Sequence, residues 1–159
     1  MDYPNRLISK QDLLEHWQGH RRLTRRVIEL FPDTQLFTFS IGTMRPFSAI
    51  IRELISIAGP GLRCMLGKKV EAFTEMGVIW ETKGDILQEW DKQTEIINTC
   101  FQKLSPQQFY EHFNLFGRYH FPTIQNILYF IDNERRHRAQ GYAYLRALDI
   151  TPPAFWEAK

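Results

Sequence analysis

Four long segments of this chain carry apolar residues at helical spacing, and this periodicity constrains the fold more than any other feature. Each segment is bounded by residues that cap or interrupt helices. The first runs from Ser9 to Pro32-Asp33 and the second from Pro46 to Gly59-Pro60-Gly61. The third runs from Gly84-Asp85 to Ser105-Pro106 and the fourth from Phe121-Pro122 to Pro152-Pro153. Apart from Thr38 to Ile41 and Val78 to Thr82, nothing alternates with the period of two that strands require. The pattern predicts an all-α protein, most simply a four-helix bundle.

The connections between these segments differ in length. The connection over residues 66 to 84 is longer than the short turn that usually joins neighbouring helices in a bundle. This length predicts a crossover between the second and third helices. Val78-Ile79-Trp80 within this connection is expected to pack on the end of the bundle. A short helix from about Pro106 to Phe113 is predicted to lead into the last long helix.

The composition is that of one ordinary globular domain. A chain of 159 residues is long enough for one core, so residues 1–159 are expected to form a single domain. A net charge of +2 favours neither nucleic acid nor an anionic membrane as a partner. No apolar run approaches the length of a membrane span and the N-terminus has no apolar leader, so a cytoplasmic location is expected. Cys64 and Cys100 lack metal-ligand spacing and are expected to be reduced core thiols.

The densest polar chemistry lies in the last thirty residues. Side chains three and four residues apart share a helix face, so one polar strip is expected beside the apolar side of the last helix, made of Asn133, Glu134, His137, Gln140 and Gly141. Imidazole is a good ligand for zinc or nickel, and a carboxylate one turn away is a suitable partner. The alternative is that His137 is a structural residue held by hydrogen bonds.

Other candidate groups are weaker. His16 and His20 have the i, i+4 spacing that suits a shared metal ion, but half-buried packing residues are the simpler interpretation. The basic runs Arg21-Arg22 and Arg135 to Arg138 are typical of solvated helix faces. The sequence has no Gly-x-Ser-x-Gly turn, and Gly59-Pro60-Gly61 lacks the Lys-Ser/Thr of a phosphate-binding loop. Hydrolase, kinase and dinucleotide-enzyme functions are therefore disfavoured.

Three stretches suggest a family. They are Leu14-Glu-His-Trp17 with Leu23-Thr24, then Ser40 to Ala58, and finally His137-Arg-Ala-Gln140 with Tyr144-Leu-Arg146 and Ile150-Thr-Pro-Pro153. Together they resemble the DinB-like proteins, a superfamily of four-helix bundles that includes metal-dependent thiol S-transferases. The last stretch is similar to the family's closing signature, a His-Arg-Gly-Gln run leading to Tyr-Leu-Arg and a proline-rich stop. The resemblance implies a DinB-like bundle over most of the chain.

The same resemblance implies where a metal would bind. Metal-binding relatives take one histidine from the second helix and two from a His-x-x-x-His on the last helix. The matching positions here are Ser56, Asn133 and His137, so one imidazole of three is retained and the site is expected to be degenerate. No resident cofactor is expected. If a divalent metal such as zinc or nickel binds, His137 should hold it with help from Asn133, Glu134 or Glu53.

Two functions remain open from the sequence. One is a DinB-like protein of unassigned activity, specifically a metal-dependent thiol transferase with a degenerate site and a thiol or other small molecule as ligand. The other is a non-catalytic binding or structural module on the same bundle. Ser56 and Arg52 share a face opposite Leu54, which predicts a solvent-open cleft or plain exposure at Ser56. A homodimer is expected from the 14% aromatic content and because relatives often form dimers.

Overall fold

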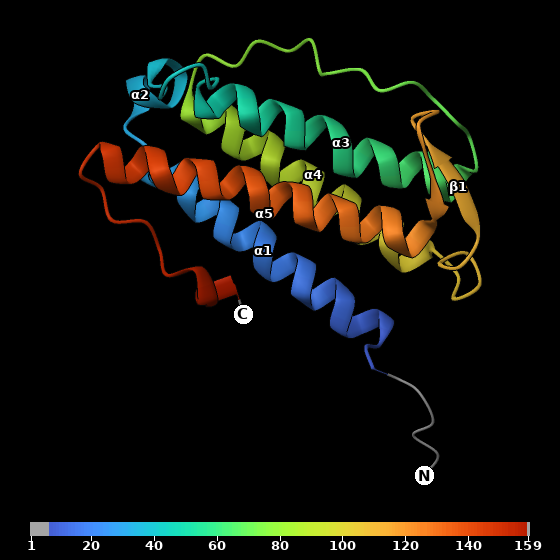
Figure 1. Cartoon of the computed structure of the whole chain (residues 1–159). Coiled ribbons are helices and arrows are strands. Elements are labelled where there is room, and N and C mark those ends of the chain that lie inside the picture. The colour runs from blue at the N-terminus through green and yellow to red at the C-terminus, as the bar shows by residue number, and fades with distance from the viewer. Residues whose placement is uncertain (1–6, 159) are drawn as a thin grey trace.

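Four long helices form a bundle in the computed structural model, which describes residues 7–158. The bundle helices are α1 (Lys10–Leu30), α3 (Phe47–Gly67), α4 (Lys83–Lys103) and α5 (Thr123–Ala147). A short helix α2 (Asp33–Thr38) follows α1, a hairpin of β1 (His112–Leu115) and β2 (Tyr119–Pro122) precedes α5, and a 3-10 turn η1 (Phe155–Ala158) ends the described chain. Helices α1 and α3 each pack against both α4 and α5 (Figure 1). The predicted all-α four-helix bundle is confirmed.

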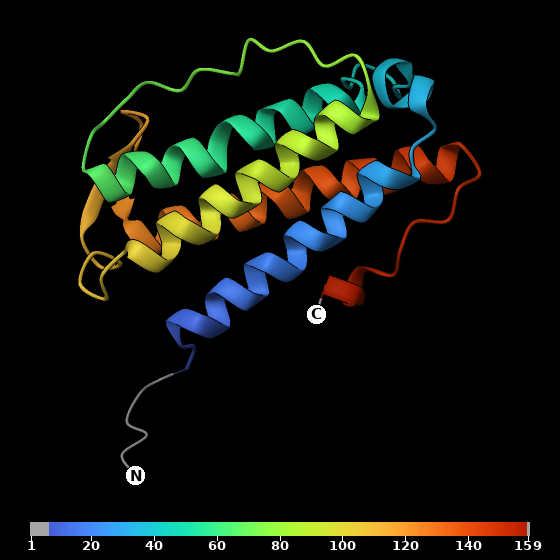
Figure 2. The ribbon, with the colours of Figure 1, turned by 180° about the vertical axis from the view of Figure 1, so that it is seen from behind.

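The segment between α3 and α4 crosses the length of the bundle, as its length predicted (Figures 1 and 2). Helices α3 and α4 point in the same direction, so the chain must return to the starting end before α4 begins. The expected packing of Val78-Ile79-Trp80 holds only for Trp80, which is buried with Trp90 in one half of the core. Val78 and Ile79 are exposed.

Capping residues explain where two of the long helices begin. Ser9 caps α1 and Thr82 caps α4, and each forms a capping box with an aspartate three residues later, Asp12 and Asp85. In each box the hydroxyl accepts the aspartate N–H, and the carboxylate accepts the N–H of the cap, so two backbone donors are satisfied at once. The box at Thr82 starts α4 slightly earlier than Gly84-Asp85 suggested.

The expected end of the second helix is wrong, because α3 continues through Gly59-Pro60-Gly61 to Gly67. The two glycines mark close helix contacts rather than a break. A Cβ on Gly61 would lie 2.5 Å from Cζ of Phe130 on α5, and one on Gly59 would lie 2.1 Å from Oε1 of Gln93 on α4. Glycine is therefore required at position 61, beside the Phe130 ring, whereas the flexible end of the Gln93 side chain can rotate away from position 59.

The short helix predicted from Pro106 to Phe113 is also wrong. Those residues form turns and then enter β1, which pairs with β2 in antiparallel register from His112–Pro122 to Leu115–Tyr119. The hairpin is fixed to α5 by Asn126, whose side-chain amide donates to the backbone carbonyls of Phe113 and Phe121. Strands of four residues are too short to give a clear alternation, which is why the sequence did not predict them.

The core fills the bundle in two clusters. One surrounds Trp17, whose ring packs beside Phe101 and Phe130, and the other contains the stacked pair Phe31 and Phe47, with ring centroids 4.7 Å apart. Cys64 and Cys100 are buried free thiols, and burial raises the pKa of both. None of the helices within residues 7–158 is long and apolar enough to cross a membrane.

Gly141→Ala is expected to lower the free energy of unfolding by about 1 to 3 kcal/mol, the usual cost of overpacking. The added Cβ would lie 2.6 Å from the Cε2 and Cζ atoms of the buried Phe47 ring, which outweighs the better helix propensity of alanine. Urea denaturation measures the change. Gly67→Ala is the matched control, because a Cβ there meets no atom within 4 Å. Equal stability of the two variants would contradict this packing.

Candidate functional site

His137 of α5 faces α3, and both of its ring nitrogens meet side-chain oxygens. Nε2 lies 3.1 Å from Oε1 of Glu53 on α3, and Nδ1 lies 2.8 Å from Oε1 of Gln140. The residue is only 6% exposed. The neutral ring donates from one nitrogen only: Nε2–H donates to Glu53 and links α5 to α3, while Nδ1 accepts when the Gln140 amide turns its NH2 group toward it.

Glu53 completes this arrangement through a second partner, Arg45. The guanidinium of Arg45 pairs with the other carboxylate oxygen of Glu53 and also lies 3.6 Å from Glu75 in the crossover. Burial raises the pKa of Glu53, but the hydrogen bond from Arg45 and the charges of His137 and Arg45 outweigh it, so the pKa is below its ordinary value of 4.5. The carboxylate is therefore ionised at neutral pH.

Ser56 is buried, not exposed as the helical wheel predicted. It is only 2% exposed because the crossover covers it. Its hydroxyl donates to the backbone carbonyl of Arg52 at 2.7 Å and accepts the backbone N–H of Met76 at 2.8 Å. The side chain therefore fastens the crossover to α3, a role that only the tertiary structure reveals.

The polar strip predicted on the last helix is divided between two neighbours. Asn133 is buried, and its Nδ2 atom has no hydrogen-bond partner within residues 7–158. Glu134 turns away from His137 and contacts α1, where Thr24 donates to it and Arg21 forms an ion pair. The structure thus brings Glu53 to His137, and it places Glu134 in a different polar cluster.

The three positions implied for a metal do not provide a fitting set of ligands. The His137 imidazole has a side-chain partner at each nitrogen, and Asn133 is a neutral amide. The Ser56 hydroxyl is hydrogen-bonded to two backbone groups. Zinc and nickel favour nitrogen and sulfur donors. Across residues 7–158, no three His, Cys, Asp or Glu side chains are grouped so that they could hold a metal ion.

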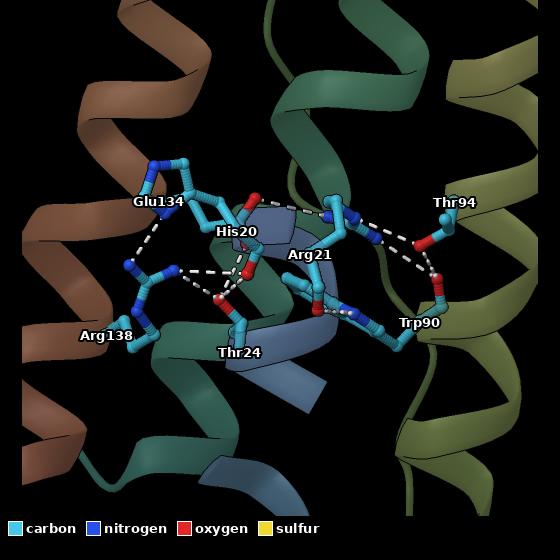
Figure 3. A network of polar contacts seen from close by, with 7 residues as sticks. All are labelled: His20, Arg21, Thr24, Trp90, Thr94, Glu134 and Arg138. Carbon is cyan, nitrogen blue, oxygen red and sulfur yellow. Dashed lines mark hydrogen bonds and ion pairs between the residues drawn. The ribbon is translucent and has the colours of Figure 1, made fainter. Parts of the chain in front are cut away.

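A second polar cluster is buried between α1, α4 and α5 (Figure 3). The Glu134 carboxylate accepts a hydrogen bond of 2.6 Å from Thr24 and lies 3.6 Å from Nη1 of Arg21. The Arg21 guanidinium stacks 3.5 Å above the Trp90 ring and donates to the Trp90 carbonyl and to Thr94. Burial lowers the pKa of Arg21 to about 10 although Glu134 opposes the shift, so the group remains charged at neutral pH.

Arg138 fixes the proton position on His20. It donates to the His20 and Thr24 oxygens and, at 2.9 Å, to Nδ1 of His20. Because guanidinium only donates, Nδ1 carries no proton, and the proton of the neutral ring is on Nε2, where it points to Nε2 of His16 at 3.2 Å. Burial, followed by the charge of Arg138, lowers the pKa of His20 to about 4. This tautomer favours packing over metal binding at His16 and His20, since Nε2 already carries a proton.

The buried arginines are the residues that sequence reasoning missed. Arg21 and Arg138 belong to basic runs that were predicted to be solvated, yet both are buried. One signal was present: Glu134 and Arg138 are four residues apart, and Arg21 and Thr24 are three apart, so each pair can share a helix face. One such polar pair on α5 and another on α1 are typical of a polar contact between these two helices.

The protein is a four-helix bundle with a crossover and a polar cluster between its helices. Comparisons with solved structures identify the fold more specifically. A DinB-like protein from Bacillus cereus matches with a TM-score of 0.74 and 16% identity, covering 91% of this chain and 95% of that one. The DinB-like protein YjoA from Bacillus subtilis matches with a TM-score of 0.70 and 13% identity, covering 91% and 96%. No family model matches the sequence, and no curated protein gives a match. The chain therefore has the DinB-like fold.

Proposed function

We propose that the protein is a metal-independent binding module on the DinB-like fold, with no catalytic role for His137. The observation that carries this proposal is the hydrogen bonding of His137, whose two ring nitrogens are held by Glu53 and Gln140. The imidazolium form donates to both of these oxygens, and the neutral ring donates from Nε2 to Glu53 and accepts at Nδ1 once the Gln140 amide turns its NH2 group toward it, so in either form both nitrogens have a partner within the protein. The imidazole needs no ion to complete its bonding.

The surrounding residues support a structural role for this polar cluster. Glu53 also pairs with Arg45, and Ser56 holds the crossover through Met76. These contacts join α3, α5 and the crossover. The neutral bond from the Met76 N–H to Ser56 contributes about 0.5 to 1.5 kcal/mol, and the Arg45–Glu53 pair, with Arg45 46% exposed, contributes at most about 1 kcal/mol. The position that binds metal in relatives thus contributes to stability in this chain.

A metal-dependent thiol transferase is the second candidate, and one observation favours it. Oε1 of Glu53 and Nε2 of His137 converge to 3.1 Å, and both are types of atom that bind zinc. Turning this arrangement into a metal site requires breaking the pair between Glu53 and His137 and finding further ligands.

Elemental analysis decides between the two candidates. After incubation with zinc or nickel and dialysis, the protein is expected to retain far less than one equivalent of metal, because His137 is the only imidazole at the three positions. Mixtures of the metal-treated protein, a low-molecular-weight thiol and an electrophile are expected to show no turnover above the uncatalysed rate.

The control is His120→Ala, which removes an exposed histidine of the hairpin. Stoichiometric metal and thiol-conjugation turnover that both disappear in His137→Ala, and both persist in His120→Ala, would replace the proposed function with the enzyme. Metal bound equally by the wild type and His137→Ala would show a site elsewhere, and His16 and His20 would be the next pair to substitute.

A further inference from the structure

A cavity of about 370 Å³ lies between α1, α5 and η1, away from the pair formed by Glu53 and His137. Its wall includes His20 from α1, Arg135, Arg138 and Tyr142 from α5, and Phe155 from η1. The end of the described chain packs tightly at this place, because a Cβ on Gly19 would lie 1.5 Å from the carbonyl oxygen of Ala158. The cavity is thus a built feature of three segments. Its lining has three arginines and one carboxylate, Asp132, which pairs with Arg135 at 3.7 Å, so the lining is basic overall.

Arg138 brings to this cavity a positive charge that has no direct ion pair among the described residues. Its residue is 6% exposed, and its three hydrogen bonds go to neutral acceptors on His20 and Thr24. Within residues 7–158 no carboxylate lies at ion-pair distance from it, and the Glu134 carboxylate pairs with Arg21 instead. Two buried guanidinium groups therefore share one buried carboxylate. A guanidinium has five N–H groups, so Arg138 retains two for another partner.

Tyr142 supplies a second unsatisfied donor to the same cavity. Its hydroxyl oxygen is buried and has no hydrogen-bond partner among the described residues. Burial raises the pKa of Tyr142, so the hydroxyl keeps its proton at neutral pH and can donate it. A buried hydroxyl without a partner is destabilising, and a ligand oxygen would supply the missing hydrogen bond.

We propose that this cavity binds a small organic anion, a carboxylate or a phosphate monoester with an apolar body. The oxyanion is bound by the free N–H groups of Arg138 and by the Tyr142 hydroxyl, while Arg135 and Arg136 attract it from the rim. The apolar body lies against the exposed Phe155 ring. This assignment deepens the proposed binding role and rests on it, because it names the class of ligand.

Titration of the full-length protein with phenyl phosphate and benzoate tests the proposal, with benzamide as the neutral analogue and inorganic phosphate as the ligand without an apolar body. Calorimetry measures affinity. A change in tryptophan fluorescence, to which Trp156 contributes with its ring 5.2 Å from that of Phe155, gives a second signal. At least one of the two organic anions is expected to bind, and benzamide is not. Inorganic phosphate is expected to bind more weakly than phenyl phosphate.

Tyr142→Phe is the informative variant, because it removes the donor without removing the ring. It is expected to weaken anion binding about tenfold or more, the loss of one hydrogen bond to a charged group. The melting temperature of the free protein is expected to stay the same or rise, since an unsatisfied buried hydroxyl is deleted. Arg136→Gln, an exposed position, is expected to weaken binding several-fold and to reduce its dependence on salt. Tyr129→Phe, also on α5, is the matched control.

Three results would overturn the site: no binding of either organic anion at millimolar concentration, equal binding of benzamide, or unchanged affinity in both Tyr142→Phe and Arg136→Gln. Equal affinity for inorganic and phenyl phosphate would overturn the organic class of ligand. Failure here is distinguishable from failure of the proposed function. Metal-dependent turnover would remove the proposed function and leave the anion site, whereas absent anion binding without turnover would remove only the site.

Discussion

Glu134→Ala is expected to lower the free energy of unfolding by about 3 to 5 kcal/mol, the largest effect of any single substitution considered for this chain. Glu134 is the buried carboxylate that faces Arg21 and accepts from Thr24. Its removal leaves Arg21 and Arg138 buried together with no anion between α1 and α5. Two uncompensated guanidinium groups in a site of low dielectric constant repel one another and lose solvation. Chemical denaturation gives the value directly.

Glu95→Ala, at an exposed position of α4, is the control and should change the free energy of unfolding by less than about 0.5 kcal/mol. A double-mutant cycle with Arg21→Met then separates the ion pair from the other contacts of Glu134. The double variant should be more stable than Glu134→Ala, because the unpaired cation has been removed as well. A cost below 1 kcal/mol for Glu134→Ala would show that the cluster is solvated.

Stability is expected to fall by on the order of 2 to 3 kcal/mol as the pH drops from 6.5 to about 4, because of His20. Its pKa in the folded protein is about 4, against 6.5 for an ordinary histidine, owing to burial and then to the charges of Arg138, His16 and Arg135. Between these values the unfolded chain binds a proton that the folded chain does not, so the contribution is complete above pH 6.5 and is lost below it. Denaturation at a series of pH values measures the slope.

His20→Asn isolates this contribution. The asparagine oxygen can accept the hydrogen bond that Arg138 donates to Nδ1 of His20, while the titrating group is removed. The pH slope between 4 and 6.5 should become flatter in this variant and remain unchanged in His120→Asn, which alters an exposed hairpin residue. An equally steep slope in His20→Asn would assign the effect to groups other than His20. Glu53 does not explain a slope above pH 4.5, because its stabilisation is lost only below that value.

The helices were predictable because their signals are local. Ser9 with Asp12 and the apolar period fix α1 within a few residues, and no distant contact is needed. The second helix was wrongly predicted to end at Gly59-Pro60-Gly61, because a glycine at a close helix contact cannot be distinguished in sequence from one that ends a helix. The distinction depends on Phe130 and Gln93, which are distant in the chain and contact Gly61 and Gly59 only after folding.

Helix geometry explains why only part of the candidate site could be predicted from the sequence. His137 was identified, and Glu53, expected as a helper if a metal binds, lies 3.1 Å from its Nε2 atom. Glu134 was placed on the same face because it lies three residues from His137. At 100° per residue the two side chains still diverge by about 60°, and α5 has α1 on one side and α3 on the other. One strip on a helical wheel can therefore be divided between two neighbours.

The crossover also limits how the length of this chain can vary. It must return along α3, whose 21 residues correspond to about 31 Å at 1.5 Å per residue. The 15 residues from 68 to 82 can span about 50 Å when fully extended, so roughly ten of them are the minimum. Added residues cost only about 0.6 kcal/mol for each doubling of length, whereas a deletion of more than about five leaves α4 unable to start at the correct end. Insertions in this segment and deletions of up to about five residues therefore preserve the topology, whereas larger deletions abolish it.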